Sequence, residues 1–178
     1  FDITRGVNPY DSYTGQSQEI IKSKAYHSTS KKDNTFVPEI RGKHIDRYYY
    51  KWDGVHFISY GSWLAAPRDP RFFVGKRILF REILGERFIC TLIKEDIIID
   101  RSLYIAKPNF DSEIQLNGIL GILASNLIAF YFRHIANEFD KLFPKIRLEE
   151  FKKLPIKSLD SPIIILISKL VTLMLENN

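Results

Sequence analysis

The histidines are the first residues of this sequence that could hold a metal ion or carry acid–base chemistry. There are four of them, His27, His44, His56 and His134, and they are scattered along the chain. No two of them lie at the helical spacing that lets one helix present two histidine ligands. A lone histidine is more often a structural residue than a ligand. We therefore expect all four to be structural.

Two groups of acidic residues could form a nuclease centre. Metal-dependent cleavage of a phosphodiester needs carboxylates that converge on the metal near a lysine. The nearest candidates are Asp96 and Asp100 with Lys94, and the pair Asp111 and Glu113. Both groups also have the pattern of ordinary turn and helix-start residues. We expect no catalytic residue and no metal site in this chain.

Cofactor binding is the third kind of chemistry to consider. A dinucleotide or S-adenosylmethionine site needs a glycine-rich turn after a strand, and no G-x-G-x-x-G or similar cluster occurs. Asn8-Pro9-Tyr10 is close to the Asn/Asp-Pro-Pro-Tyr/Phe pattern that holds a target amine beside a flipped base, but the second proline is absent. We expect no cofactor-binding site in this chain.

Positive charge is concentrated in one segment. The net charge is +5, yet residues 22–81 hold 13 basic and 5 acidic side chains, so the rest of the chain is acidic on balance. Such a field attracts a polyanion, because neutralised phosphates release counterions. A solvated basic surface without a partner is the alternative. The residues that we expect to contact nucleic acid are Lys31, Lys32, Arg41, Lys43, Arg47, Arg68, Arg71, Lys76, Arg77 and Arg81.

One part of this segment has the composition of a recognition loop. Leu64–Val74 contains two prolines, which cannot donate to a strand ladder, together with Arg68, Asp69 and Arg71. A stiff, charged loop of this kind could present its arginines to guanine edges. An ordinary surface turn is the alternative, since surface loops are commonly polar.

The elements that must position these residues change type along the chain. Residues 1–32 are polar and rich in turns, which indicates loop with one short helix near Gln18–Ser23. Short apolar or alternating runs then predict strands. They are His56–Tyr60, Arg77–Ile83, Arg87–Ile93, Ile97–Asp100 and Leu103–Ala106. Asp53-Gly54 predicts a hairpin between the run Tyr48–Tyr50 and the run Val55–Tyr60.

Helical spacing follows after Asp111. Apolar residues recur from Ile114 to Tyr131 at intervals that predict one long buried helix. Phe143-Pro144 ends any continuation, and Leu148–Lys153 predicts a short helical turn before Pro155.

The end of the chain carries a further helix signal. Ser161 as the cap and Pro162 at the first position begin a last helix, which runs over Ile163–Leu175. The expected fold is α+β, with a twisted, mostly antiparallel sheet, a long buried helix and a C-terminal helix. We expect a recognition domain over residues 1–157, with the helix of residues 158–178 packed on it or on a partner domain.

Composition and sequence pattern indicate the cellular compartment of the chain, its relation to membranes and its relation to a longer polypeptide. The single cysteine, Cys90, cannot form an internal disulfide, so we expect a reducing compartment, the cytoplasm. The uncharged stretch Ile114–Phe132 includes Gln115 and Asn117, whose insertion into lipid is costly, and we expect no membrane partner. Because the first residue is Phe1 and no signal peptide pattern follows, we expect a fragment of a longer polypeptide.

Several separated segments resemble the TaqI-like C-terminal specificity domain, the target-recognition module of adenine-N6 DNA methyltransferases and of type IIG enzymes. Ile40–Tyr48 is similar to the family's R-G-K-D-I-x-R-Y stretch, with His44 where Asp is usual, and Phe73–Arg81 is similar to F-x-x-P-K-I-L-x-R. The remaining similar segments are Gly6–Asp11 with Thr14-Gly15-Gln16, Ser102-Leu103-Tyr104, Leu116–Phe132, and Phe143–Arg147 with Leu154-Pro155-Ile156.

The resemblance implies sequence-specific recognition of double-stranded DNA for a bacterial type II or IIG restriction-modification enzyme or methyltransferase. It implies a partner, the catalytic methyltransferase domain of the same polypeptide, which would hold S-adenosylmethionine and the adenine pocket. It does not fix which residues touch bases. The alternatives from the residues alone are a protein-interaction or scaffold module that docks through Ile163–Leu175, and a nuclease, which no motif supports.

Overall fold

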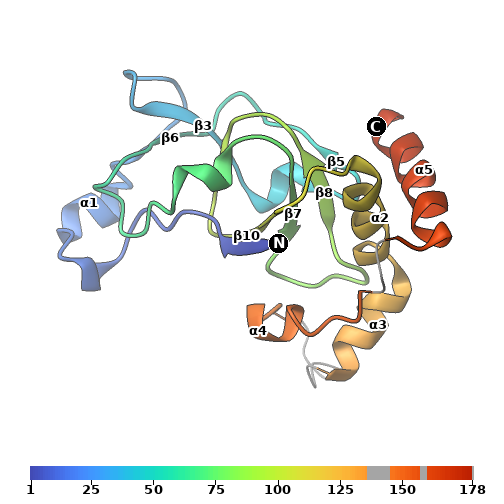
Figure 1. The fold of residues 1–178 in the computed structure, drawn as a ribbon. Helices are drawn as coiled ribbons and strands as arrows, with labels where there is room; N and C mark the ends of the chain where they lie inside the picture. Colours follow the sequence, from blue (N-terminus) through green and yellow to red (C-terminus); the bar gives the residue numbers. More distant parts are fainter. Residues whose placement is uncertain (136–144, 157–159, 178) are drawn as a thin grey trace.

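A computed structural model describes residues 1–135, 145–156 and 160–177, and a four-stranded antiparallel sheet lies at its centre (Figure 1). The strand order is β1-β10-β7-β8. The strands are β1 (Asp2–Arg5), β7 (Arg77–Arg81), β8 (Cys90–Ile93) and β10 (Leu103–Lys107). Residues 1–32 were expected to be mostly loop, and β1 corrects that: its register places Asp2 opposite Lys107.

The two faces of this sheet enter different apolar clusters. Ile78 and Phe80 of β7 lie in one cluster, and Leu79 between them lies in the other. Successive side chains of a strand point to opposite faces, so a strand buried on both sides is apolar throughout. The sheet therefore separates a helical layer from a second layer of strands.

Helices cover the face that carries Ile78 and Phe80 (Figure 1). They are α2 (Glu113–Leu123), α3 (Asn126–Ile135), α4 (Leu148–Phe151) and α5 (Pro162–Glu176). The single long helix expected from Ile114 to Tyr131 is two helices, α2 and α3, which meet at 62°. The Ser125 hydroxyl accepts the Ile128 N–H and so satisfies a main-chain donor at the start of α3. Apolar spacing continued through this break and did not reveal it.

Helix α5 packs closely on α2. A Cβ added to Gly118 would lie 2.6 Å from Ile164, and one added to Gly121 would lie 2.4 Å from Ile167. The two glycines allow this close approach because they have no side chain. The sequence predicted the start of α5, with Ser161 as the N-cap residue and a proline in the first turn. The proposed domain boundary after residue 157 remains a prediction.

The other face of the central sheet packs against a second sheet, of order β2-β6-β3-β9. Its strands are β2 (His27–Ser28), β3 (Phe36–Ile40), β6 (Phe57–Ser59) and β9 (Ile98–Ile99). Its pairs are antiparallel except for the parallel pair β3 and β9. A third, two-stranded sheet pairs β4 (Ile45–Asp46) with β5 (Tyr49–Tyr50). The mixed α+β class is confirmed, with three sheets where one was expected.

Helix α1 (Gln18–Ser23) lies where the sequence placed it, and all five expected strand segments contain strands. The expected hairpin across Asp53-Gly54 is wrong, because β5 pairs with β4 while β6 pairs with β2 and β3. Gly54 does form a turn, with φ of 80°. Phe143-Pro144 is outside the described residues. Among the residues described, no single helix has the length and hydropathy of a membrane span, and only the bent pair α2 and α3 passes that test together.

Candidate nucleic-acid interface

The predicted DNA-contacting residues fall into groups with different surroundings. Lys31 and Lys32 are exposed on the loop between β2 and β3, which extends away from the sheets (Figure 1). The Lys32 ammonium lies 5.6 Å from the centre of the Phe36 ring, a cation–π distance. The Arg47 guanidinium lies 5.4 Å from the centre of the Tyr48 ring. Lys31 and Lys32 thus lie on the second layer, whereas Arg47 lies between β4 and β5 of the two-stranded sheet.

The Leu64–Val74 loop is fastened to the rest of the domain. It contains a 3₁₀ turn (Pro70–Phe73) whose Phe72 and Phe73 are buried. Arg68 has φ of 66°, and its Nε donates to the Gly6 carbonyl at 3.3 Å. The Tyr60 hydroxyl donates to the Arg68 carbonyl at 3.1 Å. The arginines of this loop therefore project from a fixed backbone.

The side chains at the surface of this region are paired with acids. Arg71 contacts Asp2 at 2.8 Å and Asp69 at 3.2 Å, and its side chain is 57% exposed. Lys76 contacts Glu113 at 2.8 Å. Surface ion pairs of this kind are weak and exchange readily with another anion. These residues are available to DNA at small cost.

Two residues that were predicted to contact DNA instead donate hydrogen bonds to main-chain carbonyls of the domain. Arg77 has no exposed surface, and its terminal nitrogens donate to the carbonyls of Gly75, Glu95 and Ile97 at 2.6, 2.9 and 3.2 Å. Burial lowers the pKa of Arg77 to about 10. A guanidinium in this position does not reach DNA, so its burial does not fit the prediction. Arg81 is partly buried, and its Nε donates to the Gly42 carbonyl at 2.8 Å.

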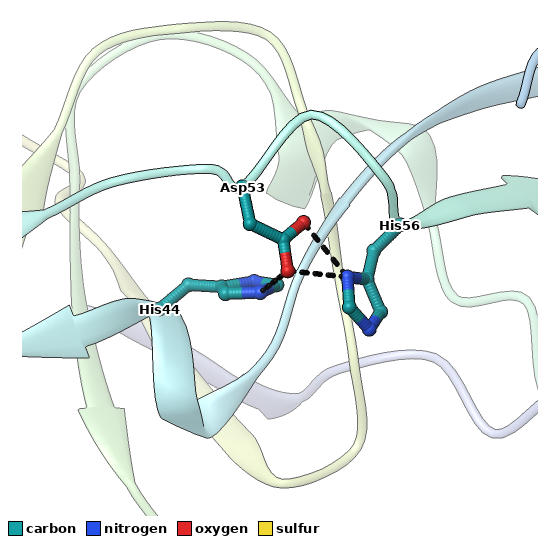
Figure 2. Close-up of side chains that lie close together, drawn as sticks. All are labelled: His44, Asp53 and His56. Carbon is teal, nitrogen blue, oxygen red and sulfur yellow. Dashed lines mark hydrogen bonds and ion pairs between the residues drawn. The ribbon is translucent and has the colours of Figure 1, made fainter. Parts of the chain in front are cut away.

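A cluster that the sequence did not reveal lies beside Arg81. Figure 2 shows Asp53 between the rings of His44 and His56. His44 Nε2 lies 3.0 Å from Asp53 Oδ2, and His56 Nδ1 lies 2.7 Å from Oδ1. Lys43 Nζ donates to Asp53 Oδ2 at 3.1 Å, and the Val55 N–H donates to Oδ1 at 3.2 Å. One carboxylate thus accepts four side-chain and main-chain donors.

Within the described residues, His44, Asp53 and His56 form the one group of three close enough to share a metal ion. The protonation of His44 argues against that use. Its Nδ1 accepts the Arg41 main-chain N–H at 3.1 Å, so the neutral ring carries its proton on Nε2 and donates it to Asp53. A metal would need the lone pair of that same Nε2. The residues therefore fit a hydrogen-bonded hub and do not fit a metal site.

The protonation states in the hub follow from its contacts. Burial lowers the pKa of His44 below its usual value, despite the hydrogen bond to Asp53. Burial acts to raise the pKa of Asp53, but the hydrogen bonds from His56, Val55 and Lys43 hold it well below its usual value. The carboxylate is ionised and His44 is neutral near pH 7. The hub fixes the exposed Lys43 next to a hollow of about 600 Å³ that Lys51 and Arg81 also line.

A second polar chain ends at Arg41. Glu39 is completely buried, and its Oε2 accepts Arg41 Nε at 2.6 Å while Oε1 lies 3.4 Å from His27 Nε2. His27 Nδ1 lies 3.0 Å from the Tyr10 hydroxyl, which accepts the Tyr26 N–H at 2.9 Å. Burial acts to raise the pKa of Glu39, but His27 and Arg41 hold it below its usual value. Glu39 is therefore a buried anion.

The sequence missed both polar groups for the same reason. His27 and Glu39 lie on different strands, and His44 and Asp53 lie on either side of the β4–β5 pair. Neither spacing has a recognisable period. The available signal was the Asp53-Gly54 turn, whose glycine brings Asp53 and His56 together. All the histidines of these groups are hydrogen-bonded, as structural histidines are.

Comparison with known proteins identifies the class. The chain matches the family model described as the TaqI-like C-terminal specificity domain over residues 37–156, which is more than half of its length. The protein is thus a specificity domain, and it belongs to the TaqI-like C-terminal family. The resemblance read from the motifs is confirmed, although Gly6–Asp11 lies outside the matched range. No curated protein sequence matches.

The chain also resembles solved structures. The type IIL restriction-modification enzyme MmeI, solved in complex with DNA, matches with 10% identity and a TM-score of 0.45. The match covers 99% of this chain and 32% of the MmeI chain. The chain therefore spans about a third of the length of that enzyme.

Proposed function

We propose that this chain recognises a specific sequence in double-stranded DNA for a larger bacterial restriction-modification enzyme or adenine-N6 DNA methyltransferase. The observation that carries the proposal is the match to a specificity-domain family over residues 37–156. That range contains most of the positively charged segment of residues 22–81. Phosphate contacts supply affinity, and contacts to base edges supply specificity.

The chemistry in this proposal belongs to another part of the parent polypeptide. A catalytic methyltransferase domain would bind S-adenosylmethionine and hold the flipped adenine, and this chain would bring it to the right site. The chain works with that domain as its partner, in the cytoplasm. The polar groups around Asp53 and Glu39 hold Lys43 and Arg41 in place, which supports a binding role for this chain.

Binding to a library of random duplexes tests the proposal. Fluorescence anisotropy should show binding by the 178-residue chain at low salt, with an affinity that falls steeply as ionic strength rises. Repeated selection and sequencing should then enrich a short motif. The absence of an anisotropy change at low salt would contradict DNA binding, and binding without enrichment would contradict sequence specificity. Purified chain supplied with labelled S-adenosylmethionine should transfer no methyl group.

A protein-interaction module is the second candidate, and the outer face of α5 is the observation that favours it. Ile163, Leu166, Leu170 and Leu173 recur at spacings of three and four residues, and each is more than half exposed. A helix that is apolar on all sides usually packs on more than one neighbour. Association through this face would resist salt, because apolar contacts are not screened. Salt dependence therefore separates the two candidates.

A further inference from the structure

We propose that Arg41 is a fixed contact to a DNA phosphate and that the buried carboxylate of Glu39 sets its orientation. This inference rests on the proposed function, because it assigns one contact within the DNA interface. Its basis is the juxtaposition of a completely buried anion with an arginine that is partly exposed.

The hydrogen bonds of Arg41 divide its side chain into a held part and an open part. Nε donates to Glu39 Oε2 at 2.6 Å. Within the described part of the chain, neither Nη1 nor Nη2 has a hydrogen-bond partner, and the side chain is 30% exposed. Two parallel N–H groups at the tip of a guanidinium match the oxygens of a phosphate. Arg41 thus presents an open fork at the surface.

Glu39 is itself held from the other side. His27 Nε2 lies 3.4 Å from Glu39 Oε1, and the Tyr10 hydroxyl lies 3.0 Å from His27 Nδ1. The Tyr10 oxygen accepts the Tyr26 N–H, so its own proton is free to go to His27 Nδ1, which leaves the His27 Nε2 proton for Glu39. Each donor between Tyr26 and Glu39 in this series of hydrogen bonds has an acceptor. The carboxylate therefore cannot turn away from Arg41 without leaving a buried charge unpaired.

The backbone of Arg41 is fixed as well. Its N–H donates to His44 Nδ1, which joins it to the hub of His44, Asp53 and His56. The following Gly42 donates its N–H to the Ser102 hydroxyl at 2.9 Å and accepts Arg81 Nε through its carbonyl. Rotamer and backbone are both set before DNA arrives. A contact that is ordered in advance loses less entropy on binding.

The neighbourhood of the fork favours an anion as its ligand. Lys43 lies two residues along the chain with 58% of its side chain exposed. It lines a neighbouring hollow with Lys51 and Arg81, whose three cations outnumber the two carboxylates, Asp46 and Asp53. Gly42 places no side chain between Arg41 and Lys43. Clustered cations on a rigid support suit the phosphate backbone, whose position is the same for every sequence. The assigned ligand is therefore a phosphate, and a base edge is the alternative that the test must exclude.

Glu39→Gln tests the role of the carboxylate, because the loss of the anchor and the loss of the negative charge are expected to change DNA affinity in opposite directions. Removing a negative charge should strengthen DNA binding if only the net field counts. Loss of the anchor should instead weaken DNA binding roughly tenfold, because an Arg41 side chain that is no longer held in one orientation loses its charge-assisted contact with the phosphate. Glu19→Gln, an exposed change of the same charge on α1, is the matched control and should leave affinity unchanged or slightly higher. Tighter binding by Glu39→Gln would overturn the assignment.

Arg41→Gln and the double variant complete the test, with anisotropy against the selected duplex and against an unrelated duplex. Arg41→Gln should weaken both complexes by a similar factor and lower the salt slope by about one. Arg41→Lys should recover part of the affinity, since it keeps the charge but loses the fork. In the Arg41→Gln background, Glu39→Gln should have no further effect. Thermal melting of each variant checks that it is folded.

The outcomes separate this inference from the function on which it rests. If the unmodified chain binds no duplex at low salt, the proposed function fails. If it binds and Arg41→Gln binds equally well, only the present inference fails. A changed sequence preference in Arg41→Gln would show a base contact and overturn the phosphate assignment. An equal further loss from Glu39→Gln in the Arg41→Gln background would show that Glu39 acts through the fold alone. If Glu39→Gln does not fold, the Arg41 variants still decide the phosphate contact.

Discussion

Arg41, at the end of strand β3, and Arg71, in the Leu64–Val74 loop, are held in opposite ways. Arg41 is fastened to a completely buried carboxylate. Arg71 is paired with Asp2 and Asp69, whose side chains are 49% and 57% exposed. Breaking the exposed pairs costs little, whereas moving Arg41 uncovers a buried charge. The burial of the partner, more than the exposure of the arginine, decides whether a cation is fixed or adaptable.

This contrast suggests how one domain could combine a constant task with a variable one. Fixed cations suit the phosphate backbone, which every duplex shares, and adaptable cations suit base edges, which differ between sequences. The following predictions test that contrast, beginning with the largest expected effect.

Arg77 is the extreme case of a held arginine, so its removal should cost the most stability. Arg77→Ala leaves three main-chain carbonyls without their donors and opens a cavity, and we expect a loss of about 3 kcal/mol in the free energy of unfolding. Arg71→Ala should change it by less than about 0.5 kcal/mol. Urea denaturation of both variants measures the difference. Equal losses would contradict the contrast.

The arginines of the Leu64–Val74 loop should affect the sequence preference of DNA binding, whereas Lys76, just before strand β7, should affect only its affinity. Arg68→Ala or Arg71→Ala should relax the selected sequence preference, because a bidentate arginine–guanine contact is worth about 1–3 kcal/mol of discrimination. Lys76→Ala should weaken binding to all sequences and lower the salt slope by about one. Selection from a random library, followed by sequencing, compares the three variants. An unchanged motif in both loop variants would show that the loop does not read bases.

The hub around Asp53 should make the fold sensitive to acid. The pKa of Asp53 is held well below its usual value near 3.8, so its contribution to stability is present above that pH and is lost as the pH falls below it. Burial lowers the pKa of His44 and so acts in the same direction, since the unfolded chain takes up a proton below about 6.5 while the buried, neutral His44 resists it. Asp53→Asn should therefore show a shallower loss of stability in acid than the unmodified chain.

A series of urea unfolding curves at decreasing pH measures this effect. Asp46→Asn is the matched control, because Asp46 is an exposed aspartate of the neighbouring strand β4. It should follow the unmodified chain at every pH. Parallel curves for Asp53→Asn and the unmodified chain would show that the hub does not couple stability to pH.

The smallest effect is expected on the outer face of α5. Leu166→Gln and Leu170→Gln change exposed residues, so the free energy of unfolding should stay within about 0.5 kcal/mol and DNA affinity should not change. Val171→Gln on the buried face of the same helix should be clearly destabilising. Thermal melting and anisotropy compare the three variants. A large loss of DNA affinity in the exposed variants would place α5 within the DNA interface.

The predictable part of the fold had a local signal in the sequence. A short continuous apolar run predicted the strand that contains Ile78 and Phe80, and Ser161-Pro162 predicted the start of α5. The break between α2 and α3 was missed because the apolar spacing continued through it, although Ser125 is a residue type that favours a helix start. The pairing of β4 with β5 was missed because each strand has only two residues. Such short pairs are decided by tertiary contacts.

The candidate site was predictable in its charge and less so in its geometry. Composition located the basic segment, but the distinction between Arg77 in the core and Arg71 at the surface depends on strand direction and burial. Glu39 lies on β3, which was not among the strands predicted from the sequence. Its role follows from His27 and Tyr10, which come from distant parts of the chain and meet it only in the folded sheet.

The register of β1 has a consequence for the order in which the chain can assemble. Asp2 pairs opposite Lys107, so β1 has no partner in this sheet until β10 has been synthesised. Contacts between such distant residues slow folding, because a long loop must close before they form. The second layer, from β2 to β6, contains a pairing of nearer residues, with His27 opposite Ile58. During translation this layer can pair before the central sheet is complete.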